Sequence, residues 1–364
     1  MSRFWSDLIQ ELSPYVPGEQ PKSAKLIKLN TNENPYGPSP LAMSVLLEDI
    51  GPDLRRYPDP YSLSLRTAVA ARYGLSPEYA FAGNGSDEVL GLAFATFFKT
   101  RTGFEGPLQY PDVSYSFYPV WARFFEVEVA PVPLSPNLEL DLTPYREGTG
   151  GIIFPNPNAP TAMALGRGEI ESLLRDTPDR VTIVDEAYVE FGAESVASLV
   201  SRYDNLLVVQ TLSKSHGLAG LRVGFAFGHP DLIEGLDRAK SSFNSYPVDR
   251  IAERIACAAI GDEEYFEARR DQVVATREWT TERLVTLGFK VLPSSANFVF
   301  ATHPRVPAKQ LFEGLRARDV LVRYFDKPRI DEYLRVTIGT DDEMRGFVSA
   351  LESLLGSPGP SDNG

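Results

Sequence analysis

Short apolar segments alternate with helix-forming segments between residues 107 and 228, and this alternation constrains the fold more than any other feature. Short apolar segments bounded by polar loops are typical of strands that are buried on both faces. Such strands, joined through helices, form parallel sheets. The chain is therefore expected to be an α/β protein with a mainly parallel sheet flanked by helices. Strands are expected at 108–110, 127–132, 151–154, 181–184, 206–210 and 223–227, and helices at 116–125, 168–174 and 195–201.

The rest of the 364-residue chain is expected to supply an arm, the start of this large domain and a second domain. Residues 1–35 are rich in Pro, Asn and Lys and form the arm, 36–247 the large domain, 248–355 a smaller C-terminal α+β domain, and 356–364 a tail that is disordered by composition. Further helices are expected at 40–48, 63–73, 86–99, 250–260, 262–287, 307–318 and from Asp341 onward, further strands at 297–301, 320–324 and 333–338, and a turn at 83–85.

The composition excludes several classes of function. The formal net charge is -13 and the sequence pI about 4.9, which argue against nucleic acid or an anionic membrane as the main partner. The single cysteine excludes an internal disulfide, and no stretch approaches the length of a membrane span. The N-terminus lacks the apolar core of a signal peptide, so a cytoplasmic enzyme is expected.

A lone lysine directly follows one of the expected strands. The segment 211–224 reads TLSKSHGLAGLRVG, with Lys214 between two serines and Arg222 eight residues later. A lysine on a loop is usually solvated, but this one has small, uncharged neighbours. Lysine amines form Schiff bases with carbonyl compounds, including pyridoxal phosphate (PLP). The segment therefore indicates an amine that meets a ligand.

Polar side chains also follow the two strands that precede this one. Asn158 follows the strand at 151–154, and Asp185 and Tyr188 follow the strand at 181–184. If the three strands are parallel, these side chains converge with Lys214 on one crevice. Asp185 would suit a protonated pyridine nitrogen, and Asn158 and Tyr188 its ring oxygen. The alternatives are that Asp185 caps a helix, that Asn158 belongs to a rigid turn and that Tyr188 is a packing aromatic.

Two segments suit a phosphate group. Residues 83–88, GNGSDE, open an apolar helix whose first backbone amides and Ser86 can bind an anion. Ser213 and Arg222 flank Lys214 and suit the same phosphate. Neither dinucleotide nor P-loop spacing occurs, which disfavours a nucleotide. The three histidines are too dispersed for a metal site, so acid–base work is assigned to Lys214.

These motifs resemble those of the fold-type I PLP-dependent aminotransferases, and among them the histidinol-phosphate aminotransferases. That family implies a mainly parallel, seven-stranded type of sheet. The sequence departs from the family pattern at Pro160-Thr161-Ala162 and at Asp112-Val113-Ser114-Tyr115. The resemblance runs nearly end to end through Leu12–Gly18, Leu29–Tyr36, Arg56–Pro60, Gly83–Glu88, Asn156–Thr161, Val184–Phe191, Ser213–Gly224, Ser295–Phe298, Val322–Arg323 and Leu334–Gly339.

The resemblance implies a role for each candidate residue. Lys214 would carry PLP, Asp185 would pair with its pyridine nitrogen, and Asn158 and Tyr188 would bind its ring oxygen. The phosphate would be held by the backbone amides of Ser86 and Asp87, by Ser213 and by Arg222. Tyr115 would stack on the ring, and Tyr57 would reach the cofactor of a neighbouring subunit, which implies a homodimer. Arg335 would bind the substrate α-carboxylate, while Arg323, near the substrate phosphate, would line the substrate pocket with Tyr36, Asn158 and Asn297.

The expected reaction is transamination between L-glutamate and imidazole acetol phosphate, which forms histidinol phosphate and 2-oxoglutarate in histidine biosynthesis. Three alternatives remain open at this point. An aromatic amino-acid aminotransferase would share the tyrosine-rich pocket, and a lyase of the threonine-phosphate decarboxylase type would share much of the motif pattern. A PLP-binding regulatory module is disfavoured by the negative charge and by the lack of a DNA-binding segment.

Overall fold

The computed structural model describes residues 4, 6–13, 19, 26–47, 51–99 and 106–356. Part of the expected arm, including residues 14–18 of the first family-like motif, lies outside these ranges. So do residues 357–364 of the expected tail. The remaining tail residue, Gly356, is the last residue of a helix.

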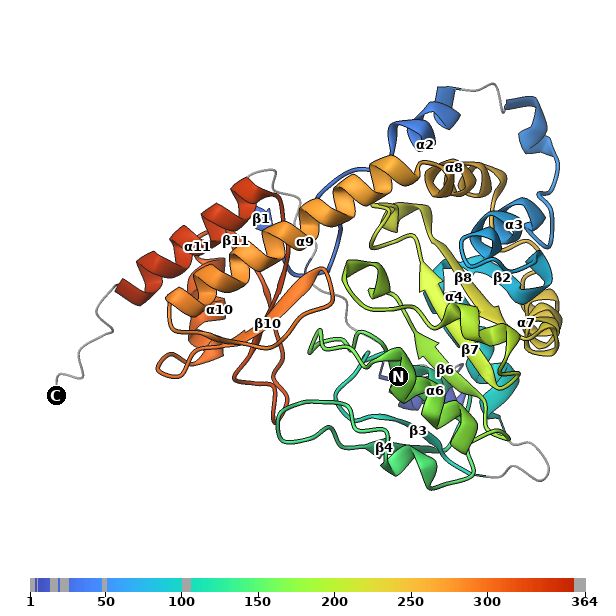
Figure 1. Ribbon diagram of the computed structural model, residues 1–364, viewed down its shortest axis with the longest axis horizontal. Helices are drawn as coiled ribbons and strands as arrows, with labels where there is room; N and C mark the ends of the chain where they lie inside the picture. The colour runs from blue at the N-terminus through green and yellow to red at the C-terminus, as the bar shows by residue number, and fades with distance from the viewer. Residues whose placement is uncertain are drawn as a thin grey trace.

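A seven-stranded sheet forms the centre of the larger part of the molecule (Figure 1). The five strands from β7 to β4 are parallel, and β8 runs antiparallel to both of its neighbours. The expected α/β fold with a mainly parallel sheet is confirmed. In spatial order the strands are β2 (Ala80–Asn84), β8 (Val223–Gly228), β7 (Leu206–Thr211), β6 (Thr182–Asp185), β5 (Ile152–Pro155), β3 (Leu108–Pro111) and β4 (Val129–Val132).

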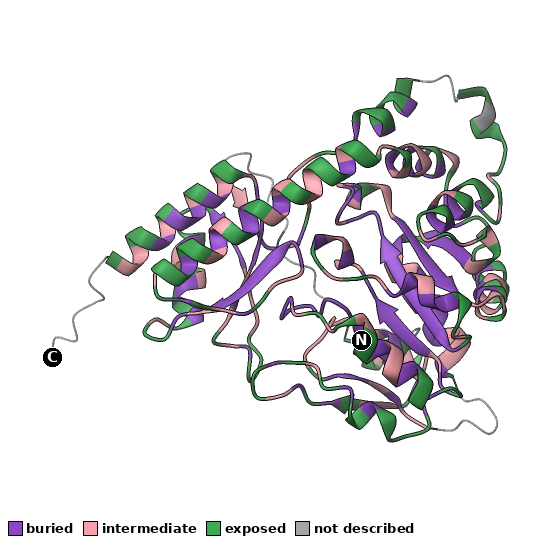
Figure 2. Cartoon of the chain, in the orientation of Figure 1, coloured by how far each residue is buried: buried purple, intermediate pink, exposed green. Residues whose placement is uncertain are grey.

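Helices cover both faces of this sheet because its strands are apolar on both sides. In β7, Leu206 and Val208 belong to one core cluster, whereas Leu207 and Val209 belong to another. The central strands β5, β6, β7 and β8 are accordingly buried at every residue, while the helices are exposed on their outer sides (Figure 2). The first cluster includes side chains of α3 (Leu63–Ala71), α6 (Arg167–Asp176) and α8 (Arg250–Gly261), and the second those of α4 (Gly85–Ala93), α5 (Tyr118–Phe124) and α7 (Pro230–Phe243).

The smaller part contains the antiparallel sheet β12-β13-β10-β9 and three helices. The long helix α9 (Glu263–Thr286) runs from the larger part into the smaller one (Figure 1). A two-stranded sheet pairs β1 (Ile27–Lys28) with β11 (Val320–Leu321), so the N-terminal segment belongs to this part. The other elements are β9 (Lys290–Val291), β10 (Phe298–Thr302), β12 (Arg323–Tyr324), β13 (Leu334–Thr337), α10 (Ala308–Arg316) and α11 (Asp341–Gly356).

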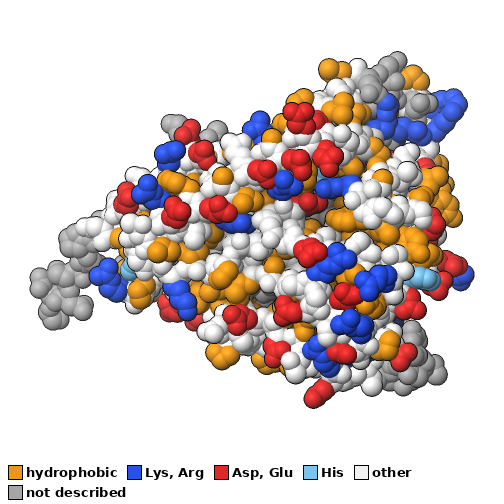
Figure 3. Space-filling view, viewed as in Figure 1, with side chains coloured by type: hydrophobic (Ala, Val, Ile, Leu, Met, Phe, Trp, Pro, Cys, Tyr) orange, Lys and Arg blue, Asp and Glu red, His pale blue; other side chains and the backbone are white. Residues whose placement is uncertain are grey.

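Charged side chains of both signs are interspersed on the face of the molecule in Figure 3. The remaining helical elements are short. The short helices are α1 (Asp7–Glu11), α2 (Pro40–Ser44) and the turns of 3₁₀-helix η1 (Val45–Leu47), η2 (Gly51–Arg55), η3 (Pro77–Tyr79), η5 (Pro144–Arg146), η6 (Val189–Phe191), η7 (Ala197–Ser201) and η8 (Ala219–Leu221).

The structure differs from the sequence-based expectations at several elements. The strand β2 was expected only as a turn, because its sequence AFAGN has small residues and no β-branched side chain. The helix α7 was not expected, because Pro230 follows His229 as in a turn; here Pro230 takes the first helical position, where no N–H donor is required. The helix expected at 86–99 is α-helical only to Ala93 and then π-helical (η4, Phe94–Phe98), the helix expected at 195–201 is 3₁₀, and the strand expected at 320–324 is divided between two sheets.

The division into domains remains a prediction. The boundary expected at residue 247 assigns α8 to the small domain, although its side chains lie in a core cluster of the large sheet. This packing favours a boundary within the long helix α9.

Candidate active site

A cavity of about 210 Å³ lies between the carboxyl ends of the parallel strands and the small sheet. The parallel pairing of β5, β6 and β7 brings the segments after these strands to one edge of the sheet. The N-terminal segment 30–32 closes another side of the cavity. Of the predicted site residues, its lining includes Tyr115, Tyr188, Lys214, Arg323 and Arg335.

The main chain of Lys214 is held between two segments. The Asn34 side-chain amide donates to the carbonyl oxygens of Lys214, at 2.9 Å, and of Ser215, at 3.0 Å. Gly217 has φ of +67°, and a Cβ there would lie 2.6 Å from the carbonyl oxygen of Tyr36, so this turn requires glycine. Lys214 Nζ lies 5.8 Å from the centre of the Tyr188 ring. The lysine amine therefore enters the cavity from a fixed backbone.

Asp185 ends β6 as a buried carboxylate beside the cavity. It accepts hydrogen bonds from the Tyr118 hydroxyl (2.9 Å) and from the Ala187 backbone N–H (3.2 Å). Burial raises the pKa of Asp185 to about 6, although both hydrogen bonds oppose this shift. Tyr118 was missed by the sequence analysis, because it lies in an aromatic-rich helix where a tyrosine resembles a core residue.

Asn158 is buried in the loop after β5. Its amide nitrogen donates to the carbonyl oxygen of Val113 (3.1 Å) and to the Thr161 hydroxyl (3.0 Å). Both amide hydrogens are used in this arrangement, and Oδ1 has no hydrogen-bond partner among the residues that the structure describes. Donation to a cofactor oxygen, as the resemblance implies, requires the amide to turn or to release one of these partners.

The residues predicted to hold a phosphate gather beside the start of α4. Gly85 has φ of +78°, and a Cβ there would lie 2.5 Å from the Arg222 guanidinium. Arg222 Nη2 lies 2.8 Å from Asp87 Oδ2, and the Tyr115 hydroxyl donates to Asp87 Oδ1 at 2.9 Å. The Ser213 hydroxyl accepts a hydrogen bond from the Thr211 hydroxyl. Thr211 ends β7, which pairs with β8 directly after Arg222. Both oxygens of the Asp87 carboxylate therefore have partners, Arg222 and Tyr115. The groups that can bind an anion here are the backbone amides at the start of α4.

Tyr36, Asn297 and Tyr57 are among the predicted residues that do not line the cavity of this chain. Tyr36 lies with its ring centre 5.1 Å from the Arg269 guanidinium. Asn297 is fully buried and donates a hydrogen bond to the carbonyl oxygen of Asn32, a residue that does line the cavity. Tyr57 is 78 % exposed, and its ring stacks on Tyr246 at 4.6 Å.

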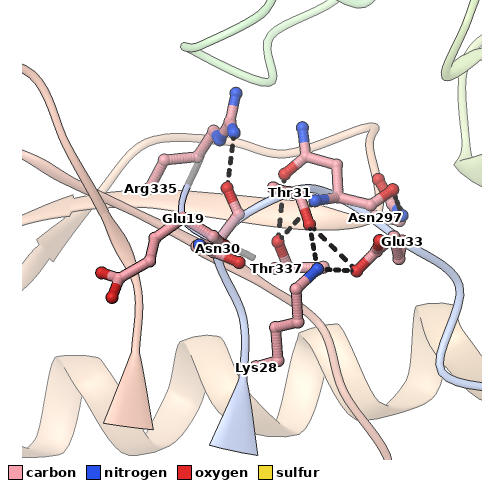
Figure 4. A network of polar contacts seen from close by, with 9 residues as sticks. Glu19, Lys28, Asn30, Thr31, Glu33, Asn297, Arg335 and Thr337 are labelled. Carbon is pink, nitrogen blue, oxygen red and sulfur yellow. Dashed lines mark hydrogen bonds and ion pairs between the residues drawn. The ribbon is translucent and has the colours of Figure 1, made fainter. Parts of the chain in front are cut away.

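Arg335 and the N-terminal segment form a network on the opposite side of the cavity (Figure 4). Arg335 Nη2 donates to the carbonyl oxygen of Asn30 at 3.0 Å. Thr337, two residues later on β13, exchanges hydrogen bonds with Asn32. Arg323 also lines the cavity, and its guanidinium lies 5.3 Å from the Phe325 ring. Two guanidinium groups therefore border the cavity on the side of the small sheet.

Comparison with known proteins defines the class of this fold and site. Residues 24–351 match the family model described as "Aminotransferase class I and II". The chain belongs to this family of enzymes, whose cofactor is PLP. In the part of the chain that the structure describes, no helix has the length and apolar character needed to cross a membrane.

The particular group within the family follows from closer relatives. Histidinol-phosphate aminotransferase 1 of Bordetella parapertussis is 55 % identical over 98 % of this chain and 100 % of the relative. The histidinol-phosphate aminotransferase of Gluconacetobacter diazotrophicus is 52 % identical over 98 % and 99 %. These identities place the chain among the histidinol-phosphate aminotransferases. The fold matches the histidinol-phosphate aminotransferase of Sinorhizobium meliloti in complex with pyridoxal-5'-phosphate, with a TM-score of 0.85, 21 % identity and coverage of 98 % of each chain.

The described residues fit PLP on three observations. The buried Asp185 carboxylate has only neutral hydrogen-bond partners among the described residues, and a buried charge calls for a cationic partner such as a pyridinium. The buried Asn158 Oδ1 lacks a partner in the same part of the chain, and a turned amide would keep the Thr161 hydroxyl as a neighbour while Nδ2 faces a cofactor oxygen. A Cβ on Gly224 would lie 2.3 Å from the Ser86 nitrogen, so glycine at this position lets β8 lie against the start of α4. The Ser86 amide, which is predicted to bind the cofactor phosphate, is therefore held close to the sheet.

Proposed function

We propose that this chain transfers the amino group of L-glutamate to imidazole acetol phosphate, with histidinol phosphate and 2-oxoglutarate as products. The observation that supports this most is the placement of Lys214 and the buried Asp185 at the ends of neighbouring parallel strands, opposite Arg323 and Arg335. The names of the relatives support the substrate over an aromatic amino acid or a decarboxylation. A cytoplasmic location is proposed with it, as suits a biosynthetic enzyme.

The proposed roles follow from the chemistry of each side chain. Bound PLP supplies an electron sink for the substrate carbon atom. Lys214 would hold the cofactor and move a proton at its Nζ, because no other amine of a described residue lines the cavity except that of Lys327 at an exposed position. Asp185 would keep the pyridine nitrogen protonated. Tyr188 would donate to the ring oxygen, and Tyr115 would lie against the ring.

The proposed substrates match the charges around the cavity. Arg323, Lys327 and Arg335 line it, whereas Asp112, the one acidic lining residue in the described ranges, pairs with Arg329 at 2.8 Å. An α-carboxylate would bind Arg335 in the two-donor geometry that guanidinium groups provide. Arg323 would bind a phosphate or a second carboxylate, which lets glutamate and histidinol phosphate use the same site. The phosphate of PLP would be held by the amides of Ser86 and Asp87, by Ser213 and by Arg222.

A substrate panel tests this function. The dialysed protein, reconstituted with PLP, should turn over histidinol phosphate with 2-oxoglutarate at least about tenfold more efficiently than phenylalanine, since phenylalanine leaves Arg323 without an anion. The comparison measures kcat/KM for both donors at matched 2-oxoglutarate. A preference for phenylalanine would contradict the proposed substrate. Release of carbon dioxide from threonine phosphate without amino transfer would indicate a lyase.

We expect the active enzyme to be a two-fold dimer in which Tyr57 binds the phosphate of the neighbouring cofactor. The support is that Tyr57 is largely exposed in the single chain, although it belongs to a motif of the family. Tyr57→Phe should weaken PLP binding about tenfold through the lost hydrogen bond to a charged group. A fluorescence titration measures the PLP Kd, with Tyr61→Phe, also an exposed tyrosine, as the control. Unchanged PLP affinity, or full activity of a monomer at high dilution, would contradict this expectation.

A further inference from the structure

Asn32 is a buried residue of the N-terminal segment with every backbone polar group in use. It is 1 % exposed and has φ of +54°. Its N–H donates to the Thr337 hydroxyl at 2.9 Å, and its carbonyl oxygen accepts from the Asn297 amide at 3.1 Å. Asparagine adopts this left-handed conformation more readily than most residues. These two hydrogen bonds therefore fix the backbone of Asn32 against the small sheet.

The side chain of Asn32 connects the small sheet to Tyr188. Oδ1 accepts from the Thr337 hydroxyl at 3.1 Å, and Nδ2 donates to the Tyr188 hydroxyl oxygen at 2.9 Å. The reversed amide would leave the buried Thr337 hydroxyl hydrogen without an acceptor among the described residues, so this orientation is the better satisfied one.

The direction of the Asn32–Tyr188 hydrogen bond decides where the phenol hydrogen points. A phenol has one hydrogen to donate. Because the Tyr188 oxygen accepts from Asn32, its hydrogen is directed elsewhere, and the ring lines the cavity 5.8 Å from Lys214 Nζ. Tyr188 is thus prepared to donate to an anionic oxygen within the cavity.

We infer that Asn32 is a positioning residue, which holds Tyr188 as a hydrogen-bond donor toward the ring oxygen of the cofactor. This inference depends on the proposed function, because it concerns the cofactor bound by Lys214. A donor to the ring oxygen favours the deprotonated oxygen and so lowers the pKa of the adjacent lysine–cofactor linkage. Asn32 would act on that pKa without touching the cofactor.

Two variants of Asn32 separate this role from a general effect on folding. Asn32→Gly removes the side chain where glycine accepts the backbone conformation without strain. It should raise the midpoint of the pH titration of the visible PLP absorbance by about half to one unit, the size expected for one lost hydrogen bond. Asn32→Asp keeps the shape but replaces the donor by an acceptor, which draws the Tyr188 hydrogen away from the cavity. It should raise the midpoint at least as far.

The experiment includes the Tyr188→Phe background, in which Asn32 has no hydroxyl to orient. There the shift caused by Asn32→Gly should disappear, a test of coupling between the two side chains.

Asn137→Gly, at an exposed turn position, is the matched control and should leave the midpoint unchanged. A wild-type midpoint in Asn32→Gly, or an equal shift in the Tyr188→Phe background, would overturn the inference. If Asn32→Gly does not fold, an unshifted midpoint in Asn32→Asp overturns it instead. A wild-type protein without a visible PLP band would instead refute the proposed function.

Discussion

Lys214→Ala should abolish the visible absorption band of the PLP-loaded protein and reduce transamination by at least about 10³-fold. The alanine variant lacks both the amine that would hold the cofactor and the group that would move the proton, and loss of a positioned acid–base group alone costs about 10²–10⁴-fold. Absorbance spectra after PLP reconstitution and single-turnover kinetics measure the two effects.

The matched control for Lys214→Ala is Lys309→Ala, which removes an exposed lysine of α10. It should retain the spectrum and the rate of the wild type. Retention of both the band and transamination by Lys214→Ala would refute the assignment of the lysine. Loss of activity with an intact band would assign the cofactor linkage to another amine.

Asp185→Asn should reduce kcat by about 10²–10³-fold and at the same time stabilise the cofactor-free protein at neutral pH. The amide has nearly the same shape but cannot keep the pyridine nitrogen protonated, and removal of one preorganised electrostatic group costs a factor of this order. Steady-state kinetics measure the loss, with the exposed Asp204→Asn as the control. A variant with wild-type kcat would exclude the proposed role of Asp185.

The stability effect follows from the pKa of Asp185, which burial raises from an ordinary 3.8 to about 6. Between these values the folded protein binds more protons than the unfolded chain, so the free energy of unfolding falls as the pH rises from about 4 to about 6. The asparagine variant has no carboxyl group to ionise and so avoids this loss of stability. Its stability advantage without cofactor should be about 1 kcal/mol larger at pH 7.5 than at pH 5. Urea unfolding at both pH values measures it, and an equal advantage at the two values would contradict the raised pKa.

The order of motifs along the chain was enough to predict the fold class, the family and the cofactor, all of which are confirmed. Most strands of the large sheet were predicted because their apolar side chains alternate with polar loops. The strand β2 was not, since its small side chains are stabilised by pairing with β8 rather than by their own propensity. The roles of the individual site residues remain predictions.

Local sequence also determined which side chains follow which strand, because Asn158, Asp185 and Lys214 are neighbours of their own apolar segments. Only the tertiary structure decided which partners they meet. The contacts of Tyr118 with Asp185 and of Asn32 with Tyr188 join residues that are 67 and 156 positions apart. Sequence periodicity reports which face of an element is buried, but it carries no information on hydrogen bonds between distant segments. The sequence therefore predicts the chemistry of this site, whereas the direction of its hydrogen bonds was set by the packing of the two sheets against the N-terminal segment.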